Sequence, residues 1–326
     1  MLRPGRRKRQ TMTTSKKPST EIGVDIGGTK THLRRYLTDG TVKDLVLPTI
    51  EWRVREWGAD AGALLSLVET FSEGAPIASM AVGAHGCDDA DECKAFQAAF
   101  AERAGFPVQV VNDAELLPAV FDIIDGMGLV AGTGSIAVCR NLNGRMLVAG
   151  GWGWVIGDEG SASGLMREAA RAVALHLDYG GGKDEPLVRL LFEALEIKSA
   201  ARIGSTVGRS GSAAQLGRHA HIIFEAAEAG SLLARQVVRD GAKELADLVA
   251  RLKHNGATST SVVAGGSVIA SQPMLWNAFS EQITNRFGGG MTARLFAGPP
   301  VEGACRLAAR LNPAPATASL PVSSSS

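Results

Sequence analysis

The 326-residue sequence has few aromatic residues, few cysteines and no long apolar run. Aromatic residues make up 5% of the chain, whereas glycine occurs 39 times. This composition favours an α/β protein with many tight turns over a coiled coil or a β-sandwich. Because no apolar run reaches the roughly 18 residues that a membrane-spanning helix needs, the sequence predicts no membrane partner.

The four cysteines are scattered and show no metal-binding spacing. No Cys-x-x-Cys motif occurs, and the six histidines form no ligand cluster with them, which disfavours a zinc site. The N-terminus also lacks the apolar stretch of a signal peptide. We therefore expect reduced thiols in a cytoplasmic protein. The cysteines are Cys87, Cys93, Cys139 and Cys305.

Charge is divided unevenly along the chain. Residues 1–20 contain seven basic residues and no acid, although the formal net charge of the whole chain is only +1. The part from Glu21 onward has 27 Lys and Arg against 33 Asp and Glu, a net charge of −6. A mildly acidic body disfavours a nucleic-acid partner. We expect residues 1–20 and the uncharged residues 313–326 to be disordered tails.

Periodicity and turn residues predict two similar halves, each with a glycine turn directly after its first strand and then a pairing strand. We expect an N-terminal lobe at 21–113, a C-terminal lobe at 114–300, and a final helix that packs back on the first lobe. Predicted strands cover 22–26, 30–36, 41–47, 77–82, 108–111, 127–131, 135–141, 146–149, 261–263 and 292–295. Predicted helices cover 59–71, 92–104, 163–177, most of 184–253, 273–286 and 301–311.

Three glycine turns follow predicted strands, at Asp25-Ile-Gly-Gly-Thr-Lys30, Gly132-Thr-Gly-Ser135 and Ala264-Gly-Gly-Ser267. Backbone N–H groups of such turns can approach phosphate oxygens because no Cβ is in the way. A carboxylate at Asp25 can organise Mg²⁺, and the third turn can lie against a base or ribose. Each turn alone is also consistent with an ordinary hairpin or helix entry. None is a P-loop, since Thr29 stands where that motif has glycine.

Two further segments carry polar side chains of interest. Asn112-Asp113 ends a predicted strand, so Asp113 either acts as a general base or caps the next helix. The segment from Gly150 to Ser161 interleaves five glycines with two tryptophans. Trp152 or Trp154 can offer an apolar face to a sugar ring, Asp158 can accept hydrogen bonds from sugar hydroxyls, and Ser161 can cap a helix. A purely structural turn is the alternative for this segment.

Together these segments resemble the actin/hexokinase/heat-shock-70 ATPase superfamily over residues 22–312. Within it, Asn112-Asp113-Ala114 and the pattern Trp-Gly-x-x-x-Gly-Asp-Glu-Gly-Ser, which ends at Ser161, resemble the N-acetylglucosamine kinase and BadF/BadG ATPase group. The resemblance implies an α/β fold of two ribonuclease-H-like lobes, with mixed sheets around a central ATP cleft. It also implies a homodimer.

The resemblance implies an ATP-dependent kinase that phosphorylates the 6-hydroxyl of an amino sugar and uses ATP and Mg²⁺. N-acetylglucosamine is the first choice of substrate and glucosamine is the second. Asp113 matches the catalytic base and Asp25 the magnesium-organising carboxylate. Residues matched to ATP are Gly27, Gly28, Thr29, Lys30, Gly132, Thr133, Gly134, Gly265, Gly266 and Ser267. Residues expected at the sugar are Asn112, Asp113, Ser135, Trp152, Gly153, Asp158 and His85. His85 departs from the family, which often has a small or hydroxylated residue there.

The same group includes dimeric ATPases that activate 2-hydroxyacyl-CoA dehydratases and hold an iron–sulfur cluster with cysteines from each subunit. The chain's cysteines do not stand at the glycine-flanked positions expected for such an activator. This reading, in which ATP hydrolysis drives a change in a partner enzyme, stays as the alternative. A sugar-sensing regulator would also need a DNA-binding helix-turn-helix, for which the polar residues ahead of Ile22 give no sign.

Overall fold

The structure is a computed structural model that describes residues 20–37 and 39–312. The predicted disordered tails lie outside the described residues, apart from one residue. Thr20 is the first residue of strand β1, where its N–H donates to the Pro76 carbonyl at 2.9 Å. The prediction of disorder is therefore wrong at Thr20, because pairing with the neighbouring strand begins there.

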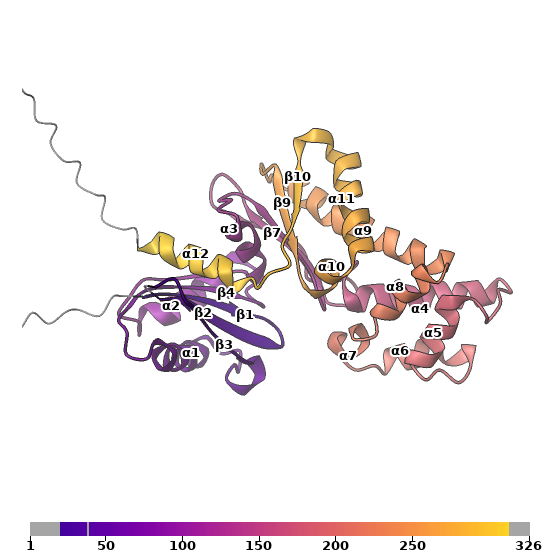
Figure 1. Cartoon of the computed structure of the whole chain (residues 1–326), viewed down its shortest axis with the longest axis horizontal. Helices are drawn as coiled ribbons and strands as arrows, with labels where there is room; N and C mark the ends of the chain where they lie inside the picture. The colour runs from indigo at the N-terminus through magenta and orange to yellow at the C-terminus, as the bar shows by residue number, and fades with distance from the viewer. Residues whose placement is uncertain (1–19, 38, 313–326) are drawn as a thin grey trace, which may run out of the picture.

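The first sheet has the strand order β3-β2-β1-β4-β5 (Figure 1). Strands β1, β4 and β5 run parallel, whereas β2 and β3 pair antiparallel on the other side of β1. Helices α1 and α2 pack against each other, and α2 also packs against β5. The bounds are β1 Thr20–Ile26, β2 Lys30–Tyr36, β3 Val42–Pro48, η1 Thr49–Glu51, α1 Trp57–Ser72, β4 Ile77–Ala84, α2 Ala90–Ala101 and β5 Val108–Val111.

The second sheet repeats this plan with the order β8-β7-β6-β9-β10. Its first strand, β6, pairs antiparallel with β7, which pairs antiparallel with β8, and β6, β9 and β10 are parallel. The predicted α/β fold of two lobes with mixed sheets is confirmed. The bounds are β6 Met127–Ala131, β7 Ser135–Arg140, β8 Met146–Gly150, β9 Ser261–Gly265 and β10 Thr292–Leu295.

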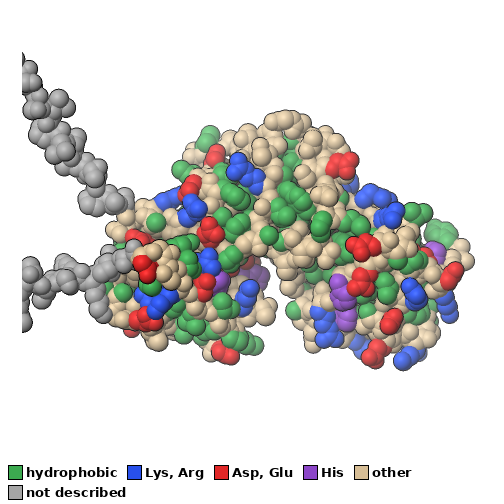
Figure 2. All heavy atoms as spheres, viewed as in Figure 1, with side chains coloured by type: hydrophobic (Ala, Val, Ile, Leu, Met, Phe, Trp, Pro, Cys, Tyr) green, Lys and Arg blue, Asp and Glu red, His purple; other side chains and the backbone are tan. Residues whose placement is uncertain are grey.

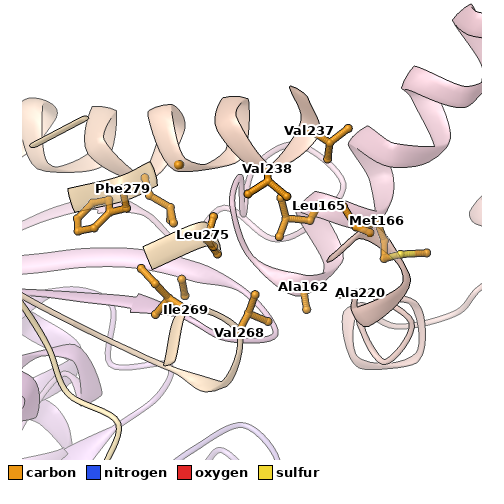
Figure 3. Close-up of a cluster of buried hydrophobic side chains, with 14 of the residues drawn as sticks. Ala162, Leu165, Met166, Ala220, Val237, Val238, Val268, Ile269, Leu275 and Phe279 are labelled. Carbon is orange, nitrogen blue, oxygen red and sulfur yellow. The ribbon is translucent and has the colours of Figure 1, made fainter. Parts of the chain in front are cut away.

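Helices α4 to α11 belong to the second half, and their apolar faces form its core. Figure 3 shows Leu165 of α4, Val238 of α9 and Leu275 of α11 meeting in one buried cluster. The stretch 184–253, predicted as mostly helical, is divided among α5 to α9. The bounds are α4 Ala162–Asp178, α5 Pro186–Ala194, η3 Ala200–Arg202, α6 Ile203–Gly208, α7 Ala213–Gly217, α8 His221–Glu228, α9 Leu232–His254, α10 Ser267–Ser271, α11 Pro273–Phe287 and η4 Gly288–Gly290.

Within the described residues, none of the helices combines the length and the apolar character that crossing a bilayer requires. Several element boundaries differ from the predicted ones, two of them for clear local reasons. Strand β4 continues to Ala84 because it stays paired with β1 to its end. Helix α2 starts at Ala90 because the Asp89 carboxylate accepts the N–H groups of Asp91 and Glu92.

A short segment, η2 (Asp113–Glu115) and α3 (Leu116–Val120), connects the two sheets. Glycines of both halves contact it so closely that no side chain fits between. A Cβ on Gly128 of β6 would lie 1.8 Å from the Ala114 carbonyl oxygen, and one on Gly303 would lie 2.0 Å from that of Leu116. Glu115 also accepts two hydrogen bonds from Arg140 of β7, at 2.6 and 2.9 Å. The connection is therefore packed against both sheets.

Helix α12 (Val301–Leu311) returns from the second half and packs on β1, β4 and α3 (Figure 1). Gly23 of β1 makes this approach possible, since a Cβ there would lie 2.5 Å from the Cys305 backbone nitrogen. The lobe boundaries after residues 113 and 300 stay predictions.

Replacing Gly128 tests how tightly the connection is packed. Gly128→Ala places a methyl group against the Ala114 carbonyl, which can only be relieved by moving backbone. We expect it to lower the free energy of unfolding by about 3 kcal/mol or more, measured by urea unfolding. Gly62→Ala is the matched control, because Gly62 lies in α1 with nothing within 4 Å of its added Cβ. It should stabilise by up to about 1 kcal/mol. Equal effects of the two substitutions would contradict the tight packing.

Candidate active site

The carboxyl ends of β1, β4 and β5 bring three predicted residues to one edge of the first sheet. Asp25 pairs in register with Gly83, and Gly83 with Val111. His85 therefore follows β4 beside the first glycine turn, and Asp113 follows β5. His85 Nδ1 lies 3.9 Å from Asp113 Oδ2.

The first glycine turn is fixed by residues that the sequence did not single out. Thr49 Oγ1 donates to the Gly27 carbonyl at 2.9 Å, and the Thr49 N–H donates to the Thr29 carbonyl at 3.0 Å. Trp52 Nε1 donates to Thr31 Oγ1, which also bonds Thr49 Oγ1, both at 3.0 Å. Gly28, Thr29 and Lys30 are exposed. The turn is therefore held from behind and open in front, as a phosphate site needs.

The carboxylate of Asp25 fits a cation. Burial, together with the charge of Asp113, raises its pKa to about 7, and the charge of Lys30 opposes the rise. Among the described residues, none donates a hydrogen bond to the Asp25 side chain. The described residues also contain no cluster of three or more His, Cys, Asp or Glu side chains arranged to hold a metal ion. A bound Mg²⁺ would therefore complete its shell with phosphate oxygens and water.

Asn112, rather than Asp113, is the helix cap. Its Oδ1 accepts the Ala114 N–H at 2.9 Å, while Glu115 accepts the Asn112 N–H at 3.1 Å, which completes a capping box. Its Nδ2 donates to the Cys87 carbonyl at 3.0 Å. Asn112 is fully buried, and its Nδ2 also donates to Asp88 Oδ1 at 3.2 Å. The structure thus gives Asn112 a part in orienting the segment, and its contact with a sugar stays a prediction.

Asp113 is thereby released from capping and faces the open edge. Its Oδ1 makes a 3.1 Å contact with the adjacent Ala114 N–H, and its side chain is 18% exposed. Burial raises the pKa of this carboxyl, the charge of His85 opposes the rise, and the charge of Asp88 adds to it. A partly desolvated carboxylate with one free oxygen is suited to accept a proton.

The second glycine turn is tied to the segment that contains the tryptophans. Ser163 Oγ donates to the Thr133 carbonyl at 2.7 Å, and the Ala162 N–H donates to the Gly132 carbonyl at 2.8 Å. The Ser135 N–H donates to Asp158 Oδ1 at 3.3 Å. Ser161 caps α4 through the Gly164 N–H, as predicted.

Ser135 and Asp158 are both buried and bonded to the protein itself. Ser135 Oγ donates to the Glu159 carbonyl at 2.8 Å. Burial raises the pKa of Asp158, and the hydrogen bond from the Ser135 N–H opposes the rise. Asp158 has a left-handed backbone, with φ of 57°, and a Cβ on Gly134 would lie 2.8 Å from its Oδ2. In this structure the two residues shape the turn.

The tip of the tryptophan segment is exposed. Trp152 is 72% exposed, and Gly153, at φ 81°, has open space around its added Cβ. Trp154 is half-buried, and its carbonyl accepts a hydrogen bond from Arg167. Trp152 borders a hollow of about 620 Å³ beside β8 and the end of α9. An aromatic ring presented in this way is available to stack on a ligand.

The third glycine turn lies beside the second, because β6 and β9 are neighbouring parallel strands and Val130 pairs with Gly265. Gly266 has φ of 106°, and a Cβ there would lie 2.6 Å from the Ala131 carbonyl oxygen. Ser267 begins α10, and its backbone nitrogen lies 3.6 Å from the Cβ position of Gly132. Both turns thus open on the same side of the second sheet.

A hollow of about 280 Å³ adjoins these two turns, bordered by Thr133, Ser267 and helices α7, α8 and α10. Four polar side chains at this hollow were not predicted from the sequence: Arg218, His221, Ser271 and Gln272. No motif marks them, since Arg218 and His221 come from the helical region between the second and third turns and the other two from the end of α10. Its position next to two glycine turns suits the base and ribose of a nucleotide.

The predicted residues therefore form two groups, one on each sheet. Asp25, the turn at 27–30, His85, Asn112 and Asp113 belong to the first sheet, and the remaining ones to the second. No hydrogen bond or ion pair between the two groups is found in the part of the chain that the structure describes. In the view of Figure 2, a deep hollow separates the part that contains the first sheet from the helical part of the second half.

Comparison with known proteins gives one family. A model described as the BadF/BadG/BcrA/BcrD ATPase family matches residues 22–307. A curated N-acetylmuramic acid/N-acetylglucosamine kinase of Clostridium acetobutylicum is 27% identical over 243 residues, which cover 69% of this chain and 76% of that protein.

Solved structures share the fold. A Chromobacterium violaceum protein, provisionally described as an N-acetylglucosamine kinase, superposes with a TM-score of 0.61 at 23% identity and covers 89% of this chain and 98% of that one. A ROK family glucokinase from Streptomyces griseus, solved with glucose and AMPPNP, gives a TM-score of 0.56 at 19% identity over 90% and 100% of the two chains.

Asp25→Asn tests whether this carboxylate is kept for binding rather than stability. Its folded pKa of about 7 exceeds its ordinary 3.8, so ionised Asp25 destabilises the folded protein above pH 7, and this cost declines as the pH falls from 7 toward 4. We expect the substitution to raise the free energy of unfolding of the ligand-free protein by about 1–3 kcal/mol at pH 8 and by less at pH 5. Urea unfolding at both values measures it.

Asp240 is exposed, so Asp240→Asn serves as the control. We expect it to change the free energy of unfolding little at either pH. A loss of stability in Asp25→Asn at pH 8, or an equal gain at both values, would contradict the prediction.

Proposed function

The chain belongs to the BadF/BadG/BcrA/BcrD ATPase family, and we propose that it is an ATP-dependent kinase of an amino sugar. It transfers the γ-phosphoryl group of ATP to the 6-hydroxyl of N-acetylglucosamine, with glucosamine as second choice. The observation that carries the proposal is Asp113, a half-buried carboxylate freed from capping by Asn112 and placed beside the first glycine turn. The C. acetobutylicum relative, described as a kinase of N-acetylated amino sugars, supports the same substrate class.

Asp113 takes the proton of the sugar hydroxyl as that oxygen attacks the γ-phosphorus. A new O–P bond forms, the bond between the γ-phosphorus and the β,γ-bridging oxygen breaks, and ADP leaves with the electron pair. The protein contributes mainly position and charge, because phosphoryl transfer needs little covalent help. The capping box of Asn112 fixes the backbone from which Asp113 projects.

The glycine turns bind the nucleotide in this proposal. Residues 27–30 and 132–134 offer backbone N–H groups to the phosphates, and residues 265–267 with the hollow beside them receive the adenosine. Asp25 would organise Mg²⁺, which neutralises phosphate charge when bound. Because the two groups of residues lie on different sheets, binding of both substrates requires the lobes to approach, which also excludes water.

The sugar lies between the lobes in this proposal. Trp152 and Gly153 supply an apolar platform that stays exposed until the lobes close. Asp158 and Ser135, which are bonded to each other here, contact the sugar only if closure rearranges the second glycine turn. Asn112 acts at one remove, by orienting Asp113.

The alternative, an ATPase that activates a partner enzyme, is disfavoured by the cysteines. All four are buried as free thiols. Cys87 and Cys93 adjoin each other near α2, Cys139 lies inside β7, and Cys305 lies in α12 against β1. A cluster shared between two subunits needs exposed cysteines from each, and these positions offer none.

A homodimer and a cytoplasmic location are parts of the same proposal. Exposed apolar side chains at Leu175 and Tyr179 border a hollow near the end of α4, which is a surface suited to a second copy. ATP supply favours the cytoplasm.

Asp113→Asn tests the proposed base. The amide keeps the shape of the side chain but accepts no proton, so we expect sugar phosphorylation to fall by about 100-fold or more, while ATP binding persists. ADP release is measured over a panel of N-acetylglucosamine, glucosamine, N-acetylmuramic acid and glucose, with ATP binding followed by calorimetry. Asp91→Asn, an exposed residue of α2, is the control and should keep full activity.

Near-wild-type turnover in Asp113→Asn would remove Asp113 as the base. A wild-type protein whose ATPase rate ignores every sugar, and which carries iron after anaerobic purification, would overturn the kinase proposal.

Arg218→Ala tests the nucleotide hollow. Arg218 borders the hollow beside Thr133 and Ser267, whereas Arg209 borders only a neighbouring one. Since Arg218 places a positive charge beside the proposed ribose and phosphates, its loss should raise the KM for ATP several-fold and leave the KM for the sugar unchanged. Arg209→Ala is the matched control. Equal effects of the two variants on the KM for ATP would place the nucleotide elsewhere.

A further inference from the structure

The backbone of His85 is fixed on both sides. Its N–H donates to the Ile26 carbonyl at the end of β1, at 2.8 Å, and its carbonyl accepts Arg53 Nη1 at 2.7 Å. Arg53 is itself buried and lies 3.4 Å from the fully buried carboxylate of Asp60. A loop residue at a strand end therefore has little freedom in its main chain.

The imidazole of His85 lies between the first glycine turn and Asp113. Nδ1 faces Asp113 Oδ2 at 3.9 Å. The opposite ring edge faces Gly28, where Cδ2 and Nε2 lie 3.4 and 3.5 Å from the position of an added Cβ. The side chain is 48% exposed, so burial does not explain its placement. A small displacement of Asp113 brings Nδ1 within hydrogen-bond distance.

Other charges around Asp113 make this neighbour matter. Asp88 adds negative charge beside Asp113. The charge of Asp113 in turn raises the pKa of Asp25, and Lys30 offsets part of that rise. Arg53 is occupied by Asp60 and by the His85 carbonyl. His85 is therefore the charged side chain that opposes the accumulation of negative charge at Asp113, together with the Ala114 N–H.

We propose that His85 is a positioning residue that orients the Asp113 carboxylate toward the sugar hydroxyl, and that its place against Gly28 fixes the separation between this base and the phosphate turn. The inference rests on the proposed kinase function. During transfer the sugar proton goes to Asp113, and His85 keeps its own proton on Nδ1, which it donates as a hydrogen bond. This role belongs to the residue type that the family pattern does not predict.

Three substitutions separate the contributions of the two edges of the imidazole ring. His85→Ala removes both edges. His85→Asn places an amide N–H where Nδ1 lies, and His85→Gln places one near Nε2. We expect His85→Ala to lower kcat for the sugar by about 10- to 100-fold, with the KM for ATP changed less than twofold. His85→Asn should recover most of kcat, and His85→Gln should recover little of it.

The pH profile supplies a readout that a merely structural residue would not move. Ionised Asp113 is the active form, so kcat/KM falls as the pH drops through its pKa. Because His85 opposes the burial that raises this pKa, its removal shifts the acid limb of kcat/KM to higher pH. Asparagine restores the hydrogen bond without a charge, so the shift should appear in both His85→Ala and His85→Asn.

His176→Ala, at the far end of α4, is the matched control, and urea unfolding checks that the His85 variants fold. Unchanged kcat in His85→Ala would overturn the inference. So would equal recovery by His85→Gln and His85→Asn, which would assign His85 to the phosphate turn instead. Wild-type protein without sugar-dependent turnover would overturn the kinase proposal itself, so the two failures are distinguishable.

Discussion

The contact between the connecting segment 113–120 and glycines of both halves is the constraint on which the site depends. Gly128 contacts the Ala114 carbonyl, Gly303 contacts that of Leu116, and Gly83 approaches the Leu116 side chain. A side chain at Gly83 or Gly128 would push the segment away from a sheet, and one at Gly303 would push it away from α12. Because Asp113 begins this segment, the packing that joins the halves also sets the place of the proposed base.

The proposed site is electrostatically costly for the folded protein. Burial raises the pKa of Asp25, Asp113 and Asp158, which means that the folded protein disfavours their charged forms. Proteins generally pair or neutralise such groups. Here Lys30 and His85 offset only part of the charge, which is consistent with an edge that completes its electrostatics when a cation and phosphates bind.

The glycine turns are fixed by side chains from other segments. Thr49 and Trp52 hold the turn at 27–30, and Ser163 with Asp158 holds the turn at 132–135. A turn whose backbone is set in advance loses less conformational entropy when a ligand binds. The same bonds occupy Ser135 and Asp158, so any direct contact of these two residues with a sugar depends on movement of the lobes.

The sequence by itself determined the strands, the two-lobed α/β fold and the three glycine turns, because strand periodicity and glycine chemistry are local properties. The sequence located a helix cap at Asn112-Asp113. Which of the two side chains is the cap was decided by tertiary contacts. Asn112 became the cap because Cys87 and Glu115 complete its hydrogen bonds. The sequence did not predict the roles of Arg218, Thr49 and the neighbours of His85. These residues reach the site only through strand register and through close packing between segments that are far apart in the chain.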